Sequence, residues 1–232
     1  MAVARENKFD MISRLRVADY LTLSNGIRRN DTDSKTALSM FCSIHQRFVA
    51  AYVFIFLGYE FDRFDGMVAR WRNECSEWGK ELDSLSDLVT FVVAPAIMLF
   101  SLGFHTLVDQ GVLAFYVVCG VARLARFNVA ADLVPKDGRG KPLYQEGFAT
   151  AYAALVISTV VAVFAYMDWS FGIVSSQLFL GTWLEFHPAM VVVGLLSTMM
   201  ISKRLRFTVD LGLAIPVLTT VVFVACWIKL PA

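Results

Sequence analysis

The chain has 232 residues, of which 57% are hydrophobic and only 18% are charged, and its mean hydropathy is +0.58. This charged fraction is lower than in ordinary soluble domains, so the composition predicts a membrane protein and argues against a soluble one. The formal net charge is +1, so the distribution of charge along the chain matters more than its sum. The cysteines have no CxxC spacing, which indicates neither a zinc site nor a disulfide framework.

The first elements in chain order leave two interpretations open. ADYLTLSNG has the composition of the start of a spanning helix, but the polar run IRRNDTDSK interrupts it. Either the first span is displaced to about Ala37–Tyr59, or the polar run is a loop or local break. We expect an N-terminal amphipathic or cytoplasmic segment at residues 1–36 and one membrane domain at residues 37–232.

Apolar runs predict the rest of the architecture. Phe48–Phe61 leads into an acidic motif, and we expect one long helix there. Later runs are long enough and poor enough in charge to form spanning helices, or most of one. The expected fold is all-α, a polytopic integral membrane bundle of six to seven transmembrane helices. The later runs are Leu82–Gly103, Gly111–Phe127, Ala149–Met167, Pro188–Ile201 and Leu211–Ile228.

Two acidic motifs, DRFDGMVAR and GKELDSLSD, stand between these apolar runs. On helices, Asp62 and Asp65 share one face, and so do Asp83 and Asp87. If the two faces pack together, the carboxylates repel one another unless they bind metal or take up protons. Hard oxygen ligands suit Mg²⁺ or Mn²⁺, which often bridge carboxylates to substrate phosphates. Solvated surface helices are the alternative, but apolar flanks disfavour it, and the motifs predict a divalent-cation site.

The combined pattern D-x-x-D-G-x-x-A-R-x8-G-x-x-x-D-x-x-x-D resembles the signature of the CDP-alcohol phosphatidyltransferase family, and every signature position is matched. The resemblance implies a membrane enzyme that uses Mg²⁺ or Mn²⁺ to transfer a phosphatidyl group from a CDP-linked lipid to an alcohol, releasing CMP. It implies that Asp62, Asp65 and Asp83 are metal ligands. Asp87, at the edge of the cluster, is expected to touch the metal and to act as the general base that accepts the proton of the attacking hydroxyl.

The resemblance also implies a site for the CDP-lipid. Small residues leave room for the nucleotide, an arginine can donate a charged fork to phosphate, and the polar residues of TLSNG resemble those that contact the nucleotide in the family. The alternatives are a helix-packing role for Gly79 and a helix cap for the TLSNG residues. The residues expected to bind the CDP-lipid are Thr22, Asn25, Gly66, Ala69, Arg70 and Gly79.

Further stretches, including GKELDSLSDLVTFVVAPA and CGVARLARFNV, resemble the branch of the family that joins CDP-diacylglycerol to L-serine, although Val92 stands where that pattern has glycine. Arg123, Arg126 and Asn128 are the candidates for binding the carboxylate of serine or a phosphate, because arginines three residues apart share a helix face. The alternative is a pair of arginines that snorkel to the membrane interface.

Basic residues surround the acidic motifs and flank several apolar runs, so the positive-inside rule places the metal site at the cytoplasmic face. The resemblance implies a homodimer in the endoplasmic reticulum membrane of a eukaryote or the plasma membrane of a prokaryote, with no nucleic-acid partner. A sister enzyme that uses glycerol 3-phosphate, inositol or inositol phosphate is an open alternative. A divalent-cation transporter or scaffold is a remote one.

Overall fold

The computed structural model describes six parts of the chain, residues 35–72, 77–130, 145–166, 178, 185–207 and 211–229. Apart from turns, loops and one isolated bridge, these parts are helical except for two short strands, β1 (Gln145–Glu146) and β2 (Arg206–Phe207), which pair antiparallel. The all-α class predicted from the sequence is therefore confirmed. The predicted boundary between residues 36 and 37 adjoins the start of the described part and stays a prediction.

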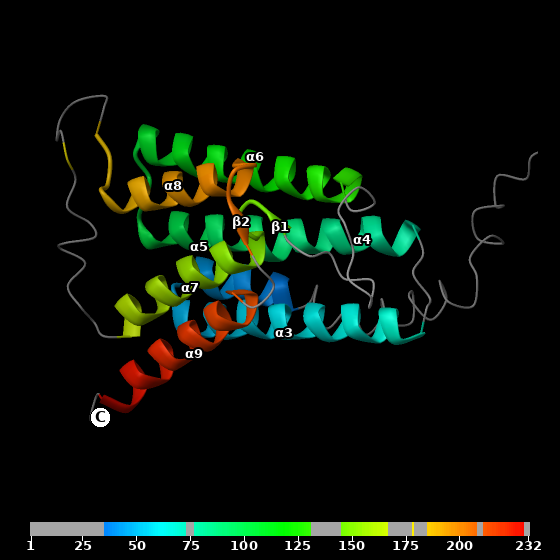
Figure 1. Ribbon diagram of the computed structural model, residues 1–232. Helices are drawn as coiled ribbons and strands as arrows, with labels where there is room; N and C mark the ends of the chain where they lie inside the picture. Colours follow the sequence, from blue (N-terminus) through cyan, green and yellow to red (C-terminus); the bar gives the residue numbers. More distant parts are fainter. Residues whose placement is uncertain are drawn as a thin grey trace, which may run out of the picture.

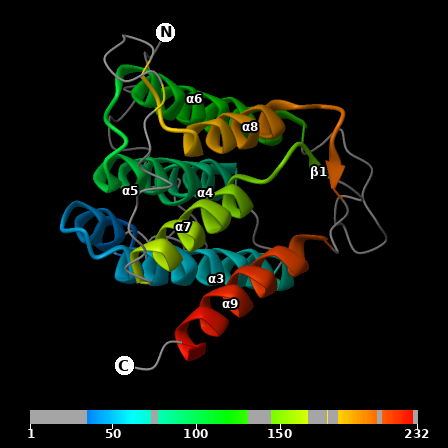
Figure 2. The ribbon, with the colours of Figure 1, turned by 90° about the vertical axis from the view of Figure 1, so that its left-hand side faces the viewer.

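The helices form a stack of elongated rods (Figures 1 and 2). α6 packs most extensively on α8, and α3 packs most extensively on α7, which also contacts α9. α4, a π-helical segment and α5 follow one another as a single rod between these two groups (Figure 1). The helices are α3 (Phe48–Arg72), α4 (Glu77–Leu88), the π-helical segment (Val89–Val93), α5 (Ala94–Leu102), α6 (Leu107–Ala130), α7 (Thr150–Tyr166), α8 (Ala189–Ile201) and α9 (Leu211–Lys229).

A helical break lies within Ala37–Tyr59, the range considered for a displaced first span. Residues 35–44 are helical, and α3 begins only at Phe48. Gln46 takes a left-handed conformation with φ 58°, and the amide of Arg47 donates to the carbonyl of Cys42 at 2.7 Å. A left-handed residue with a bond back across the last turn is a common way to end a helix. The chain therefore turns before it enters α3, the helix that carries Asp62.

The π-helical segment is packed on both sides by specific contacts. The phenol of Tyr116 in α6 donates a hydrogen bond of 2.9 Å to the carbonyl of Phe91, and the hydroxyls of Thr36 and Thr90 lie 2.7 Å apart. At Gly120 in α6, an added Cβ would stand 2.6 Å from a methyl carbon of Val92. Glycine at this position therefore makes room for Val92, the residue that departs from the branch pattern.

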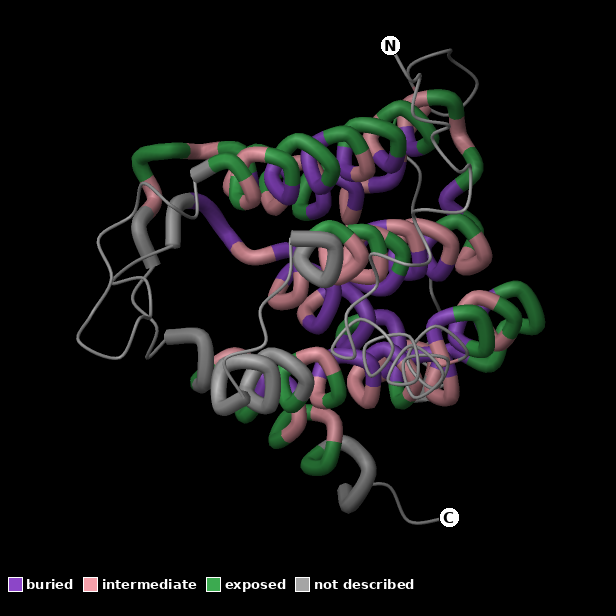
Figure 3. Tube along the Cα trace, turned by 90° about the vertical axis from the view of Figure 1, so that its right-hand side faces the viewer, coloured by how far each residue is buried: buried purple, intermediate pink, exposed green. Residues whose placement is uncertain are grey.

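Apolar side chains fill the interior and also cover much of the outside. Buried residues from several helices form one core, among them Ile55, Phe91, Tyr116 and Leu155. The outward faces of α6, α8 and α9 are exposed (Figure 3), and many of their exposed residues are large and apolar. Two helical stretches in the described part of the chain, Glu81–Leu102 and Leu107–Val129, are long and apolar enough to cross a membrane. Three more apolar helices are shorter, so the number of spans stays a prediction.

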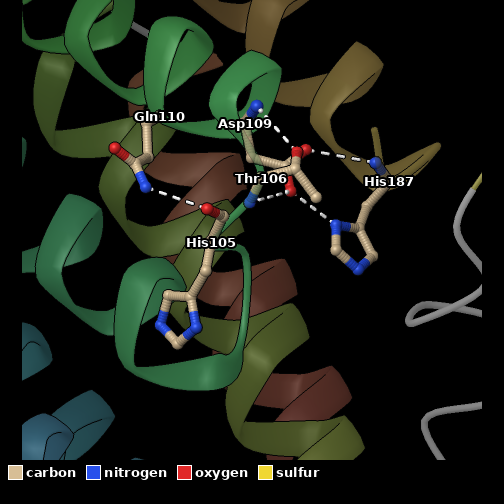
Figure 4. A network of polar contacts seen from close by, with 5 residues as sticks. All are labelled: His105, Thr106, Asp109, Gln110 and His187. Atoms are coloured by element: carbon tan, nitrogen blue, oxygen red, sulfur yellow. Dashed lines mark hydrogen bonds and ion pairs between the residues drawn. The ribbon is translucent and has the colours of Figure 1, made fainter. Parts of the chain in front are cut away.

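A buried polar network fixes the start of α6 against the start of α8 (Figure 4). Thr106 and Asp109 bond reciprocally, each side chain accepting from the other's backbone amide, which is a helix-capping arrangement. The carboxylate of Asp109, fully buried, also accepts from the backbone amide of His187 at 3.1 Å and lies 2.5 Å from its ring Nδ1. The edge of the Phe104 ring packs against the same imidazole. These contacts hold one end of α6, and its other end reaches the acidic motifs.

Candidate functional site

Carboxylates from the two acidic motifs come together between α3 and α4. α3 presents Asp62, and α4 presents Asp83 and Asp87 one helical turn apart. The carboxyl groups of Asp87 and Asp62 lie within hydrogen-bonding reach of each other, and Asp87 also interacts electrostatically with Asp83. All three side chains are partly buried. The two acidic faces therefore converge on one place, and their like charges make it a strongly acidic site.

The other residues predicted to bind metal or CDP-lipid lie outside the part of the chain whose side chains are described. The backbone of α3 or α4 carries five of them, on the helices that bear the described aspartates, and two precede residue 35. Their roles stay predictions. These residues are Thr22, Asn25, Asp65, Gly66, Ala69, Arg70 and Gly79.

Arg123 stands next to the acidic site. It lies near the end of α6, and its side chain is only 7% exposed. Its guanidinium interacts with Asp87 and with the phenol of Tyr152 on α7, and its Nε has no hydrogen-bond partner in the described part of the chain. A buried donor without a partner costs free energy, about 1–3 kcal/mol for an uncharged group and more for a charged one. The structure thus places one arginine, with a free donor, against the carboxylate predicted to be the base.

Arg126 turns toward a different part of the molecule. Its guanidinium donates to the carbonyl of Ile201 at 2.7 Å and to that of Met200 at 3.4 Å, so it caps the end of α8. Arginine is well suited to this position, because the last carbonyls of a helix lack partners and carry partial negative charge. Arg123 and Arg126 leave α6 in the same region, but the described contacts of Arg126 are with α8.

Asn128, the third acceptor candidate, contacts α4. The hydroxyl of Ser84 donates to its Oδ1 at 3.0 Å, and its Nδ2 points to both carboxylate oxygens of Glu81, each at 3.5 Å. Ser84 lies next to Asp83 in the chain and one turn before Asp87. The end of α6 is thereby joined to the helix that carries two of the signature aspartates.

The donor set of this site is hard oxygen. Asp62, Asp83 and Asp87 contribute carboxylates, and one described arginine stands beside them. Among the described side chains, no three histidine, cysteine, aspartate or glutamate residues are already arranged as a metal centre. Asp65, the remaining acidic residue of the signature, is not one of those side chains. Converging carboxylates are hard oxygen ligands, chemically suited to a divalent cation of the Mg²⁺ class.

Comparison with protein families gives this geometry a context. The profile of the family described as CDP-alcohol phosphatidyltransferase matches residues 34–183, a range that contains both acidic motifs and Arg123. The chain belongs to the CDP-alcohol phosphatidyltransferase family. The resemblance to this family is therefore confirmed, and the matched range includes Asp62, Asp83 and Asp87.

Curated members of the CDP-alcohol phosphatidyltransferase family extend the match. A CDP-diacylglycerol–serine O-phosphatidyltransferase of Saccharomyces cerevisiae is 41% identical over 207 residues, covering 87% of this chain and 73% of the yeast protein. The enzyme of the same name from Bacillus subtilis is 41% identical over 100 residues, 42% of this chain and 56% of its own length. An archaetidylserine synthase of Methanothermobacter thermautotrophicus is 32% identical over 170 residues, 68% of this chain and 70% of the relative.

Sequence reasoning missed several residues that the structure connects to the site. Ser84 and Glu81 stand between signature positions, and no motif marked them as partners of Asn128. Asp109 and His187 pair across 78 positions of sequence, and the only local signal was the capping spacing of Thr106 and Asp109. Such pairs become visible only when the packing of helices is known.

Proposed function

We propose that the chain is a CDP-diacylglycerol–serine O-phosphatidyltransferase, which transfers the phosphatidyl group of CDP-diacylglycerol to L-serine and releases CMP. A relative with that activity in its name, identical at 41% of positions over 87% of this chain, supports the proposal. The observation that carries it is the meeting of Asp62, Asp83 and Asp87, with Arg123 beside Asp87. The reaction needs carboxylates that bind a divalent cation and a guanidinium that binds the carboxylate of serine.

A divalent cation, Mg²⁺ or Mn²⁺, fits the residues at this place. Asp62 and Asp87 lie within hydrogen-bonding reach, which two carboxylates avoid unless a proton or a cation stands between them. Asp62, Asp65, Asp83 and Asp87 would hold the cation. When bound, it would offset the negative charge that grows on the leaving CMP as the phosphorus–oxygen bond breaks.

Asp87 supplies the base. It accepts the proton of the serine hydroxyl, whose oxygen attacks the lipid-bearing phosphorus, and the bond from that phosphorus to the oxygen of CMP breaks. Arg123 holds the carboxylate of serine, because its buried Nε is available and its position beside Asp87 brings the hydroxyl to the base. Arg126, also predicted for the acceptor, contributes by fixing the end of α8 near this place. Phosphate and nucleotide contacts come from the residues predicted for the CDP-lipid, Thr22, Asn25, Gly66, Ala69, Arg70 and Gly79.

The enzyme would work as an integral membrane protein, with the site at the cytoplasmic face. The long apolar helices Glu81–Leu102 and Leu107–Val129 and the exposed apolar faces of α6, α8 and α9 support the membrane setting. Residues 37–232 would form the membrane domain, in a homodimer. The membrane would be the endoplasmic reticulum in a eukaryote or the plasma membrane in a prokaryote.

A panel of alcohols tests the proposal. Purified protein is given CDP-diacylglycerol and Mn²⁺ or Mg²⁺, and CMP release is measured with L-serine, glycerol 3-phosphate and inositol. We expect release with serine, little with the other alcohols, and none after EDTA until the cation is restored. Equal rates with glycerol 3-phosphate would refute the choice of serine. Release that is insensitive to EDTA would refute the role of the cation.

A further inference from the structure

We propose that the phenol of Tyr152 binds the carboxylate of the acceptor together with Arg123, as a second hydrogen-bond donor that comes from another helix. The inference rests on the proposed function and deepens it, because it names a residue that selects serine by its carboxylate. Neither the signature residues nor the candidates for the acceptor include Tyr152. Its basis is a pair of neighbouring donors, one on α6 beside Asp87 and one on α7, that lack hydrogen-bond partners among the described residues.

The guanidinium of Arg123 and the phenol of Tyr152 act on each other electrostatically, yet no hydrogen bond joins them. Arg123 is only 7% exposed, and its Nε has no hydrogen-bond partner in the described part of the chain. The hydroxyl of Tyr152, on a partly buried side chain, has none there either. Two donors that share one carboxylate stand on either side of it and do not bond to each other. The pair therefore has the arrangement of a carboxylate site without its ligand.

The charges around the Tyr152 phenol favour an anion. Arg63 of α3, whose guanidinium also bonds to the phenol of Tyr59, acts on Tyr152 as Arg123 does. Among the described residues, the charged side chains that act on this phenol are thus both cationic. Tyr152 also lies in the first turn of α7, which begins at Thr150, and the start of a helix carries partial positive charge. A carboxylate placed here is attracted by two guanidiniums and by the helix.

This position also fits the geometry of the proposed reaction. Arg123 acts on Asp87 as well as on Tyr152, so the two donors stand close to the proposed base. The carboxylate of serine and the carbon that bears its hydroxyl are attached to the same carbon atom. A carboxylate held by Tyr152 and Arg123 therefore brings the hydroxyl toward Asp87, and fixing a reactant in this way lowers the barrier to attack. The acceptor would lie where α4, α6 and α7 meet.

Tyr152→Phe removes the proposed donor and keeps the packing of the ring. That ring stands edge-on to the ring of Phe148, with 6.1 Å between their centroids, and this contact does not need the hydroxyl. The matched control is Tyr52→Phe in α3, which also removes a buried phenol hydroxyl, one that faces threonine hydroxyls of α9. Tyr52 lies ten residues before Asp62, about 15 Å along the helix axis, so its loss should not reach the acceptor.

The experiment measures kinetics with CDP-diacylglycerol, Mn²⁺ and serine, and uses two competitive inhibitors that separate the polar groups of serine. Ethanolamine has the hydroxyl and the amino group, whereas 3-hydroxypropanoate has the hydroxyl and the carboxylate. We expect Tyr152→Phe to raise the serine KM and the inhibition constant of 3-hydroxypropanoate by roughly tenfold, the size of one lost hydrogen bond to a charged group. The inhibition constant of ethanolamine, the KM for CDP-diacylglycerol and kcat should stay within about twofold of wild type. Tyr52→Phe should keep the wild-type serine KM.

A double variant separates a ligand of serine from a support of Arg123. If each donor contacts the carboxylate itself, Tyr152→Phe should raise the serine KM further in an Arg123→Lys protein. No further rise there would show that Tyr152 acts only through Arg123, and would overturn the inference. An unchanged serine KM in Tyr152→Phe, or an equal loss for ethanolamine, also overturns the inference and leaves the proposed function standing. A wild-type protein that does not use serine overturns the proposed function with it.

Discussion

Gly147 approaches the carbonyl oxygen of Met200 so closely that a Cβ atom on it would stand 2.4 Å from that oxygen. The same Cβ would lie 3.1 Å from a guanidinium nitrogen of Arg126. Gly147 itself has φ 78°, and its amide donates to the carbonyl of Leu205 at 2.8 Å. The chain between β1 and α7 therefore crosses the end of α8 at a point where only glycine fits.

Gly147→Ala should destabilise the fold. The left-handed conformation alone costs alanine about 1 kcal/mol, and the contact with the backbone oxygen of Met200 adds to this because neither atom can move freely. We expect the midpoint of thermal unfolding in detergent to fall by several degrees. Gly194→Ala, on α8 with nothing closer than 4.0 Å, is the control and should not lower it. A Gly147→Ala protein as stable as wild type would show that the segment can shift.

Asp109→Ala should destabilise the protein while leaving the site chemistry intact. The substitution leaves the imidazole Nδ1 and the backbone amide of His187 without their acceptor in a buried place. Breaking such a pair costs about 3 kcal/mol, and we expect a lower unfolding midpoint with nearly unchanged serine KM at low temperature. The matched control is His105→Ala, whose exposed ring packs on Phe100 and should cost far less. A selective rise in serine KM would contradict a purely architectural role for the pair.

Arginine-to-lysine changes should separate the two arginines of α6. Lysine keeps the positive charge but cannot make the paired, planar hydrogen bonds of a guanidinium. Each change therefore tests whether that hydrogen-bonding geometry is needed. In Arg126→Lys we expect a lower unfolding midpoint, because the two carbonyls at the end of α8 lose their shared donor. In Arg123→Lys we expect the larger rise in serine KM. The reverse order, with Arg126→Lys raising the serine KM more, would make Arg126 the carboxylate ligand.

Asp87→Asn should remove the proton acceptor and keep a group of the same size. We expect CMP release to fall by roughly 100-fold or more, while CDP-diacylglycerol still binds in the presence of Mn²⁺. Asp62→Asn is the comparison, and it should weaken the metal-dependent binding itself. Near-normal turnover by Asp87→Asn would assign the base to another residue.

Part of this site could be predicted from the sequence because the spacing of its aspartates is a local pattern. Asp83 and Asp87 share a face by helical periodicity, and packing of that face against the acidic face of α3 brings Asp62 to them. The partner of Arg126 could not be predicted from the sequence, because the end of α8 is 75 residues away and any backbone carbonyl can accept a hydrogen bond from arginine. The break at Gln46 was missed for another reason: a non-glycine residue in the left-handed region carries no clear sequence mark.

The π-helical segment Val89–Val93 determines how the side-chain faces of α4 are rotated about the helix axis relative to those of α5. A π-helical turn contains more residues than an α-helical turn. In an α-helix, each residue rotates the chain by about 100° about the helix axis. Deleting one residue from this segment would let the rod continue as a regular α-helix. Asp83 and Asp87 would then be turned by about 100° relative to the buried face of α5. The chain could keep its core and lose the meeting of its carboxylates, so the orientation of the site depends on five residues that carry no charge.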